Sequence, residues 1–231
     1  MNKEIIFFGC SHSCYNWNEI INIPEYSHIN LAESGSSNEL ILNKIKNWLI
    51  ENEENYENKI LVIQFSYLNR KNIFFDINET EYKLNGINAI FSNYTELSDE
   101  NKKIISKYYE DWISYFFNLN YEFKKLLVEI EILKKLFDLI GIKYVWYLFD
   151  GVNIDEMGYG DDKKLKNTKL DFNLEKFNFI KFENTFFCSE YAEMSKIRNC
   201  DIIPDSDTHL HHIGRKMVGN IIKETINKNL I

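Results

Sequence analysis

Two segments at opposite ends of the sequence carry side chains that together suit nucleophilic catalysis. Gly9-Cys10-Ser11-His12-Ser13 follows an apolar run, so a hydroxyl stands at the exit of a predicted strand. Asp205-Ser206-Asp207-Thr208-His209 places two carboxylates just before a histidine. A serine becomes a nucleophile when a base takes its proton, and an ionised carboxylate holds that base in the required tautomer. We therefore predict Ser11 as the nucleophile and His209 as its base.

A serine hydrolase also needs hydrogen-bond donors for the oxyanion that forms during attack. The predicted donors are the backbone N–H of Ser11, the backbone N–H of Gly35 at the start of a helix, and the side-chain amide of Asn69. Asn69 belongs to the polar segment that follows the clearest predicted strand. In an open α/β sheet the ligand crevice lies beyond the carboxyl ends of the strands, commonly between the first and third strands. The segments with Ser11 and Asn69 are therefore expected at one crevice.

Each of these residues also has a purely structural interpretation. In that interpretation Ser11 caps the first helix and Gly35 serves only as a turn residue. Asn69 and Arg70 then satisfy the backbone of their loop. Cys10 is interpreted as a buried packing thiol rather than as a nucleophile. The sequence leaves these alternatives open.

Carboxylates and imidazoles at short spacing near the C-terminus have a second interpretation as ligands of one metal ion. These residues are Asp205, Asp207, His209, His211 and His212. A metal site would leave Ser11 and Gly35 unexplained. Ligands at alternate positions also need an extended backbone where the last helix should begin. The triad is therefore the favoured interpretation, and we expect no metal.

Hydrophobic patterns predict strands that alternate with helices. Short apolar runs predict strands over 4–9, 27–32, 59–65 and 143–149. Helical spacing predicts helices from the capping box Ser36-Ser37-Asn38-Glu39 to about Glu51, from Ser98 to a left-handed cap at Gly141, and from about His212 to Asn227. Strands alternating with helices imply right-handed crossovers and a parallel sheet that is covered on both faces.

The expected fold is therefore α/β, a three-layer α/β/α sandwich around a central, mostly parallel sheet with flavodoxin-like order. The length of 231 residues fits one domain over 1–231. Residues 69–98 are irregular and predict an excursion from the sheet, with a hairpin around Asn85-Gly86. Glycines and a charged run predict a long loop over about 150–178.

The ordered landmarks resemble the SGNH hydrolases, the GDSL-like lipases and esterases. Gly9-Cys10-Ser11 looks like the family's Gly-Asp-Ser block, and residues 30–38 are similar to its second block. Asp207-Thr208-His209, with Gly214 in the helix that follows, resembles the last block. The resemblance implies a Ser11-His209-Asp207 triad and an oxyanion-hole role for Gly35. Asp205 is the runner-up for the acid, because the family's aspartate usually stands where this sequence has Ser206.

The third block departs from the family pattern of Gly-x-Asn-Asp. This sequence has Ser66-Tyr67-Leu68-Asn69, so the oxyanion asparagine is Asn69, shifted by one residue, or is missing. A divergent subgroup with Asp-x-His and an arginine after the third strand looks closer to this chain. By that resemblance Arg70 binds a substrate carboxylate or bridges loops.

We expect a serine esterase that cleaves a small acyl ester, such as an O-acetyl group on a sugar or another polar metabolite, without a cofactor. The alternative, motivated by the altered third block, is a weakly active or inactive SGNH-like domain that binds a carbohydrate or a protein partner. The formal charge of −8 argues against nucleic acid and anionic membrane surfaces as partners. The apolar run before Gly9 is only four residues long, Ile5 to Phe8, which is too short for a signal-peptide core. The four cysteines form no Cys-x-x-Cys motif. A cytoplasmic location is therefore expected, and the oligomeric state stays open.

Overall fold

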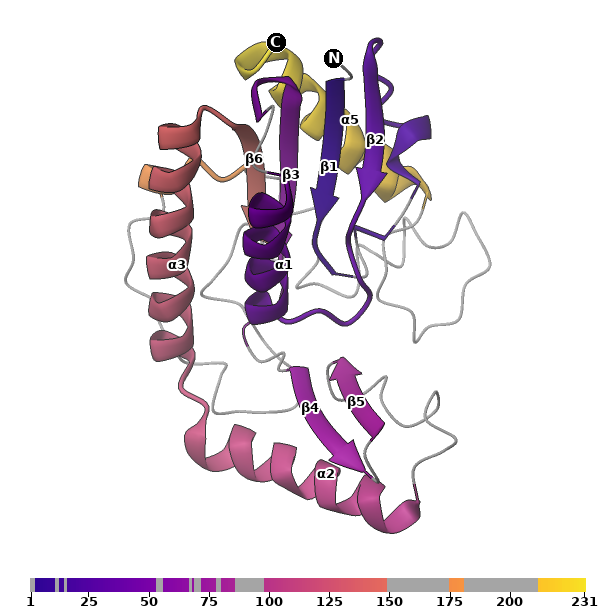
Figure 1. Cartoon of the computed structure of the whole chain (residues 1–231), viewed down its shortest axis with the longest axis vertical. Helices are drawn as coiled ribbons and strands as arrows, with labels where there is room; N and C mark the ends of the chain where they lie inside the picture. The colour runs from indigo at the N-terminus through magenta and orange to yellow at the C-terminus, as the bar shows by residue number, and fades with distance from the viewer. Residues whose placement is uncertain are drawn as a thin grey trace.

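The central feature of the computed structural model is a four-stranded sheet with the order β2-β1-β3-β6 (Figure 1). The structure describes residues 3–10, 13–14, 16–52, 56–66, 68, 72–77, 80–85, 98–148, 175–180 and 212–231. The strands are β1 (Lys3–Phe8), β2 (Tyr26–Asn30), β3 (Lys59–Phe65) and β6 (Lys143–Leu148). All three strand pairs are parallel, which confirms the predicted sheet.

The central strands are apolar throughout because both faces of the sheet are covered. Successive side chains of a strand point to opposite faces. In β1, Ile6 and Phe8 therefore pack on one side, whereas Ile5 and Phe7 pack on the other. This double burial explains why a continuous apolar run, rather than an alternating one, marks each of these strands.

One face of the sheet packs against α1 (Asn38–Glu51) and α3 (Leu119–Ile140). The N-cap of α1 is Ser37, whose hydroxyl accepts a hydrogen bond from the Leu40 N–H at 3.3 Å. The predicted capping box placed the start one residue earlier, at Ser36, and is wrong in this detail. Gly141 ends α3 in the left-handed conformation, with φ 72°, as predicted.

The other face packs against α5 (His212–Asn229) and a short 3₁₀ helix, η2 (Trp17–Glu19). Val218, Ile222 and Ile226 of α5 are buried there. Gly219 lets α5 approach closely, because a Cβ at this position would clash with the Ile20 side chain that follows η2. The helices on the two faces complete the three-layer α/β/α sandwich.

The helical stretch predicted from Ser98 to Gly141 is interrupted. It consists of α2 (Asp99–Asp111), a π-helical turn η4 (Trp112–Phe116) and α3. Phe117 is extended, with ψ 123°, and the Asn118 side chain caps α3 by accepting a hydrogen bond from the Tyr121 N–H at 2.9 Å. Asparagine therefore starts a new helix where helical spacing alone predicted a continuous one.

A two-stranded antiparallel sheet lies apart from the main sheet, beyond the carboxyl ends of its strands (Figure 1). It consists of β4 (Asn72–Ile77) and β5 (Thr80–Asn85). Ile77 pairs with Thr80, so the strands reverse between these two residues. Asn85 is the last residue of β5, and the rest of the hairpin predicted around Asn85-Gly86 lies outside the described residues.

The structure describes two further 3₁₀ turns. One is η3 (Tyr56–Asn58), which directly precedes β3 in the sequence. The other is η6 (Glu175–Phe177), which packs beside β6. The Phe177 carbonyl accepts a hydrogen bond from Trp146 Nε1 at 2.5 Å, which fixes η6 on the sheet. The rest of the long loop predicted over about 150–178 lies outside the described residues. Among the helices that the structure describes, none combines the length and the apolar character that a membrane span requires.

Candidate functional site

The described part of the site is the carboxyl edge of the sheet, which we define as the last residues of β1, β2 and β3, the segments that follow these strands, and the first turn of α1. Of the predicted site residues, Gly35 is described. Ser11, Asn69, Arg70, Asp207 and His209 lie outside the described residues, as does Asp205. The structure therefore defines the surroundings of these residues, and their mutual geometry stays a prediction.

The exit of β1 requires glycine for steric reasons. A Cβ on Gly9 would lie 2.7 Å from Ser13 Oγ, 2.8 Å from Ser13 Cβ and 2.9 Å from Gln64 Cβ. Real Cβ atoms do not approach other heavy atoms this closely. The chain that leaves β1 can therefore fold back on its own exit and on β3 only because residue 9 lacks a side chain.

A buried polar network lies directly beneath this exit. The Ser13 hydroxyl donates to Gln64 Oε1 at 2.6 Å, and Gln64 Nε2 donates to Cys10 Sγ at 3.1 Å. The Tyr147 hydroxyl lies 3.4 Å from Ser13 Oγ. Ser13 is 2% exposed, and Cys10 and Gln64 are fully buried. The network uses uncharged groups, so burying it costs far less than burying a charge.

The backbone of Ser13 is held as firmly as its side chain. Its N–H donates to the Cys10 carbonyl at 2.8 Å. Its carbonyl accepts from Asn30 Nδ2 at 2.8 Å and from Trp17 Nε1 at 3.1 Å. The described residues on both sides of positions 11 and 12 are thus fixed to β2, β3 and η2.

The loop after β2 runs beside the exit of β1. The Leu31 N–H donates to the Phe7 carbonyl at 2.9 Å, and the Glu33 N–H donates to the Gly9 carbonyl at 3.1 Å. An ion pair of 2.6 Å between Glu33 and Lys44 ties the loop to α1. Gly35 then turns the chain with φ 77°, a conformation that favours glycine. Gly35 is therefore a turn residue two positions after the contact with the β1 exit, and its role as an oxyanion donor stays a prediction.

The exit of β3 is tied to the first turn of α1 by a single side chain. The Ser66 N–H donates to Asn38 Oδ1 at 2.6 Å, and Asn38 Nδ2 donates to the Ser66 carbonyl at 2.9 Å. The hydroxyls of Ser36 and Ser66 are buried and have no hydrogen-bond partner within the part of the chain that the structure describes. Hydroxyl groups therefore gather where β3 meets α1.

Neither described cysteine has the properties of a nucleophile. Cys10 is buried, as predicted for a packing thiol, and its sulfur accepts the Gln64 hydrogen bond. Partial desolvation, with a smaller contribution from Cys10, raises the pKa of the Cys14 thiol to about 11. Because the thiolate is the reactive form, a thiol with such a pKa is unreactive near neutral pH.

This arrangement is similar to a solved structure titled as a member of the lipolytic protein G-D-S-L family from Veillonella parvula DSM 2008. The TM-score is 0.50, and the match covers 98% of this chain and 99% of that chain at 16% sequence identity. This chain shares the fold of that lipolytic protein. No family model and no curated protein matches the sequence. The comparison therefore shows a shared fold and no more.

Three residues of the carboxyl edge were missed by the sequence analysis: Ser13, Gln64 and Asn38. Gln64 had a usable signal, because it is a polar residue inside the apolar run of β3. Asn38 was noticed only as part of a capping motif. No cluster of three or more potential metal ligands occurs among the residues that the structure describes, and the side chains from Asp205 to His212 are not among them.

Proposed function

We propose that this protein is a serine ester hydrolase in which Ser11 attacks a small acyl ester. The observation that supports it best is the close packing at Gly9, two residues before Ser11, at the end of β1. The order β2-β1-β3 makes the gap between β1 and β3 the point where the strand order reverses, and ligands of open α/β sheets bind there. The shared fold with a GDSL lipolytic protein supports the same assignment.

The proposed reaction uses the predicted triad. His209 takes the proton of the Ser11 hydroxyl as its oxygen bonds to the acyl carbon, and Asp207 orients the imidazole and stabilises its charged form. The ester C–O bond then breaks, and His209 returns the proton to the departing alcohol. Water, activated by His209, hydrolyses the acyl-enzyme and frees Ser11.

The proposed oxyanion donors are the N–H groups of Ser11 and Gly35 and the amide of Asn69. The carbonyl oxygen becomes negative during attack, and fixed donors stabilise that charge. The contact of the Glu33 N–H with the Gly9 carbonyl holds the loop with Gly35 beside the chain that leads to Ser11. Arg70 is proposed to bind a carboxylate of the substrate or to bridge loops.

Packing of the two chain ends supports the pairing of Ser11 with His209. The segment after Ser11 leads to η2 and Ile20, and the segment after His209 leads into α5. These two elements are in contact where Gly219 meets Ile20 and Trp17. Both segments that carry the predicted catalytic residues therefore adjoin elements on the same face of the sheet.

Intact-mass spectrometry after incubation with a fluorophosphonate tests the proposal. Wild-type protein should gain one adduct, because an activated serine attacks phosphorus and displaces fluoride. Ser11→Ala and His209→Ala should gain none. Ser27→Ala is a matched control, since Ser27 is an exposed serine of β2, and it should label like wild type.

Circular dichroism must show that every variant is folded. An unlabelled but folded wild-type protein would overturn the hydrolase and favour the alternative, an inactive domain of this fold that binds a carbohydrate or a protein partner. An adduct that persists in Ser11→Ala would show that another residue is the nucleophile.

A further inference from the structure

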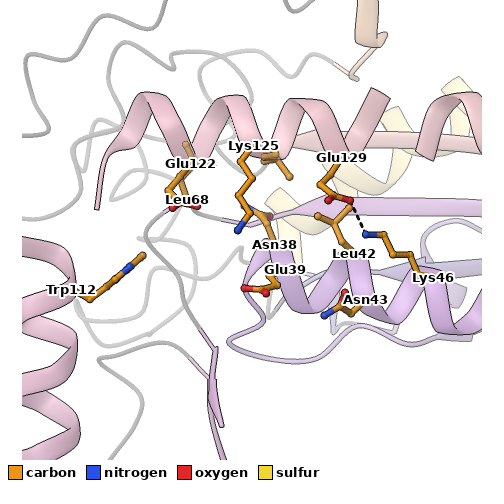
Figure 2. Close-up of a pocket in the computed structure, with 11 residues that line it drawn as sticks. Asn38, Glu39, Leu42, Asn43, Lys46, Leu68, Trp112, Glu122, Lys125 and Glu129 are labelled. Carbon is orange, nitrogen blue, oxygen red and sulfur yellow. Dashed lines mark hydrogen bonds and ion pairs between the residues drawn. The ribbon is translucent and has the colours of Figure 1, made fainter. Parts of the chain in front are cut away.

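A pocket of about 210 Å³ lies between α1 and α3, next to the π-helical turn (Figure 2). Ligand pockets for drug-sized molecules span about 300–1,000 Å³, so this one suits a single ring-sized unit. Three of its lining side chains, Leu42, Leu68 and Leu126, are apolar and buried. The pocket therefore has an apolar floor.

Polar and charged groups of both signs surround this floor. Glu39 and Lys46 of α1 face Glu122, Lys125 and Glu129 of α3 (Figure 2). Lys46 and Glu129 form an ion pair of 2.7 Å across the pocket. Three carboxylates disfavour an anion, and two ammonium groups disfavour a cation. A wholly apolar ligand would bury these groups without partners, which is costly.

Trp112 is the aromatic residue among the described residues that line the pocket, and it projects toward the pocket from η4 (Figure 2). The ring of Phe117 meets Trp112 edge to face, with 5.2 Å between centroids, and the Phe117 N–H donates to the Trp112 carbonyl at 2.8 Å. Single π-helical turns occur frequently at functional sites. The turn and the aromatic contact thus hold Trp112 in a defined orientation.

The pocket adjoins the carboxyl edge of the sheet. Asn38 lines it and, through its side chain, holds both backbone groups of Ser66 at the exit of β3. Leu68, which also lines it, follows that exit by two residues. A ligand in the pocket would therefore lie on the α1 and α3 side of the proposed crevice.

We propose that this pocket binds an uncharged polyhydroxylated ring, a monosaccharide unit, which forms the alcohol part of the ester. The apolar face of such a ring stacks on Trp112, and its hydroxyls hydrogen-bond to the carboxylates and ammonium groups of the walls. The assignment to the alcohol of the substrate rests on the proposed hydrolase activity. The binding itself does not.

Saturation-transfer NMR with the methyl glycosides of glucose, galactose and N-acetylglucosamine tests the binding. At least one glycoside should bind the wild-type protein, and Trp112→Ala should weaken that binding by about tenfold. Trp112→Phe, which keeps an aromatic face, should lose less. Tyr115→Ala is the matched control, because Tyr115 is 78% exposed in the same π turn and does not line the pocket.

Hydrolysis assays separate the pocket from the catalytic proposal. Trp112→Ala should lower about tenfold the ratio of kcat/KM for the 6-O-acetyl derivative of the bound glycoside to kcat/KM for methyl acetate. Methyl acetate carries no sugar ring that could occupy the pocket.

Any of three results would overturn the pocket assignment. None of the three glycosides binds, Trp112→Ala leaves their binding unchanged, or choline binds in their place. If neither ester is hydrolysed but a glycoside binds through Trp112, the hydrolase proposal fails and the pocket assignment stands.

Discussion

The two edges of the central sheet are stabilised in opposite ways. At the amino edge, where the strands begin, charged side chains lie near solvent. Lys3 pairs with Glu25 at 2.6 Å, and their side chains are 40% and 71% exposed. At the carboxyl edge, neutral side chains are buried and hydrogen-bonded, as in the contacts of Gln64 with Ser13 and of Asn38 with Ser66.

This difference shows where the fold depends on accurate geometry. An exposed ion pair contributes little, because water solvates each charge almost as well as its partner does. A buried polar group that loses its partner costs about 1–3 kcal/mol. We therefore expect substitutions at the carboxyl edge to cost much more stability than substitutions at the amino edge.

The largest effect is expected for Gly9→Ala, which should lower the free energy of unfolding by about 3 kcal/mol because the new Cβ clashes with Ser13 and Gln64. Gly141→Ala, just before β6, is the matched control. Gly141 has φ 72° but no neighbour within 4 Å of an added Cβ, so only backbone strain of about 1 kcal/mol is expected. Denaturant titration of both variants measures the difference, and equal losses would contradict the steric argument.

A second prediction concerns the buried network. Gln64→Met keeps the side-chain length but leaves the Ser13 hydroxyl without its acceptor, so stability should fall by about 2 kcal/mol. Adding Ser13→Ala should cost less in this background than in wild type, because the hydroxyl has already lost its acceptor. A double-mutant cycle by chemical unfolding measures this coupling, and purely additive losses would count against the hydrogen bond.

Asn38→Ala should cost about 1.5 kcal/mol, because it removes both hydrogen bonds to the backbone of Ser66. Asn47→Ala is the matched control on the exposed face of α1, where alanine is the better helix former and stability should not fall. Thermal unfolding distinguishes the two. Similar melting temperatures for the two variants would mean that Asn38 does not tie β3 to α1.

His28 in β2 lies between the two edges and gives a smaller, pH-dependent effect. Desolvation lowers the pKa of His28 below its usual 6.5, and its Nδ1 is buried without a partner within the described chain. Below about pH 6.5 the unfolded chain binds a proton that the folded protein excludes. The stability that neutral His28 contributes is therefore fully present above about pH 6.5, and it is lost as the pH falls through the folded-state pKa.

His28→Gln should accordingly lose less stability than wild type between about pH 8 and pH 5.5, because the titrating group is gone. Urea unfolding at both pH values measures the two losses. Identical losses in wild type and variant would show that His28 titrates alike in the folded and unfolded states.

The smallest effect is expected at the amino edge. The hydrogen bond between Lys3 and Glu25 raises the pKa of the lysine and lowers that of the carboxyl. Both groups stay in contact with solvent, however, so Lys3→Met should leave the unfolding midpoint unchanged within error. A loss as large as that of Gln64→Met would remove the contrast between the two edges.

The bounds of the strands in the main sheet could be predicted to within about two residues, because short apolar runs rich in β-branched residues are typical of buried strands. β3 was predicted with its observed bounds of Lys59–Phe65. The end of α3 at Gly141 was equally clear, since a left-handed cap is a local property of glycine.

Contacts between distant residues could not be predicted. The Ser13 hydroxyl donates a hydrogen bond to Gln64, which lies far away in the sequence. The residues around Ser13 do not indicate Gln64 as its partner, and the residues around Gln64 do not indicate Ser13. The break at Phe117 was hidden because apolar residues continue at helical spacing across it. Of the candidate site, the structure describes Gly35, and the roles of Ser11 and His209 stay predictions.

The close contact of Gly219 with Ile20 also constrains the order of folding. This contact joins positions that are separated by most of the chain, and closing so long a loop costs conformational entropy. We therefore expect the contact to form late, after the sheet has formed. On the ribosome, η2 and its face of the sheet stay uncovered until α5 has been synthesised. During that interval Trp17, Ile21 and Val62 expose apolar surface, and the nascent chain is at its most prone to aggregation.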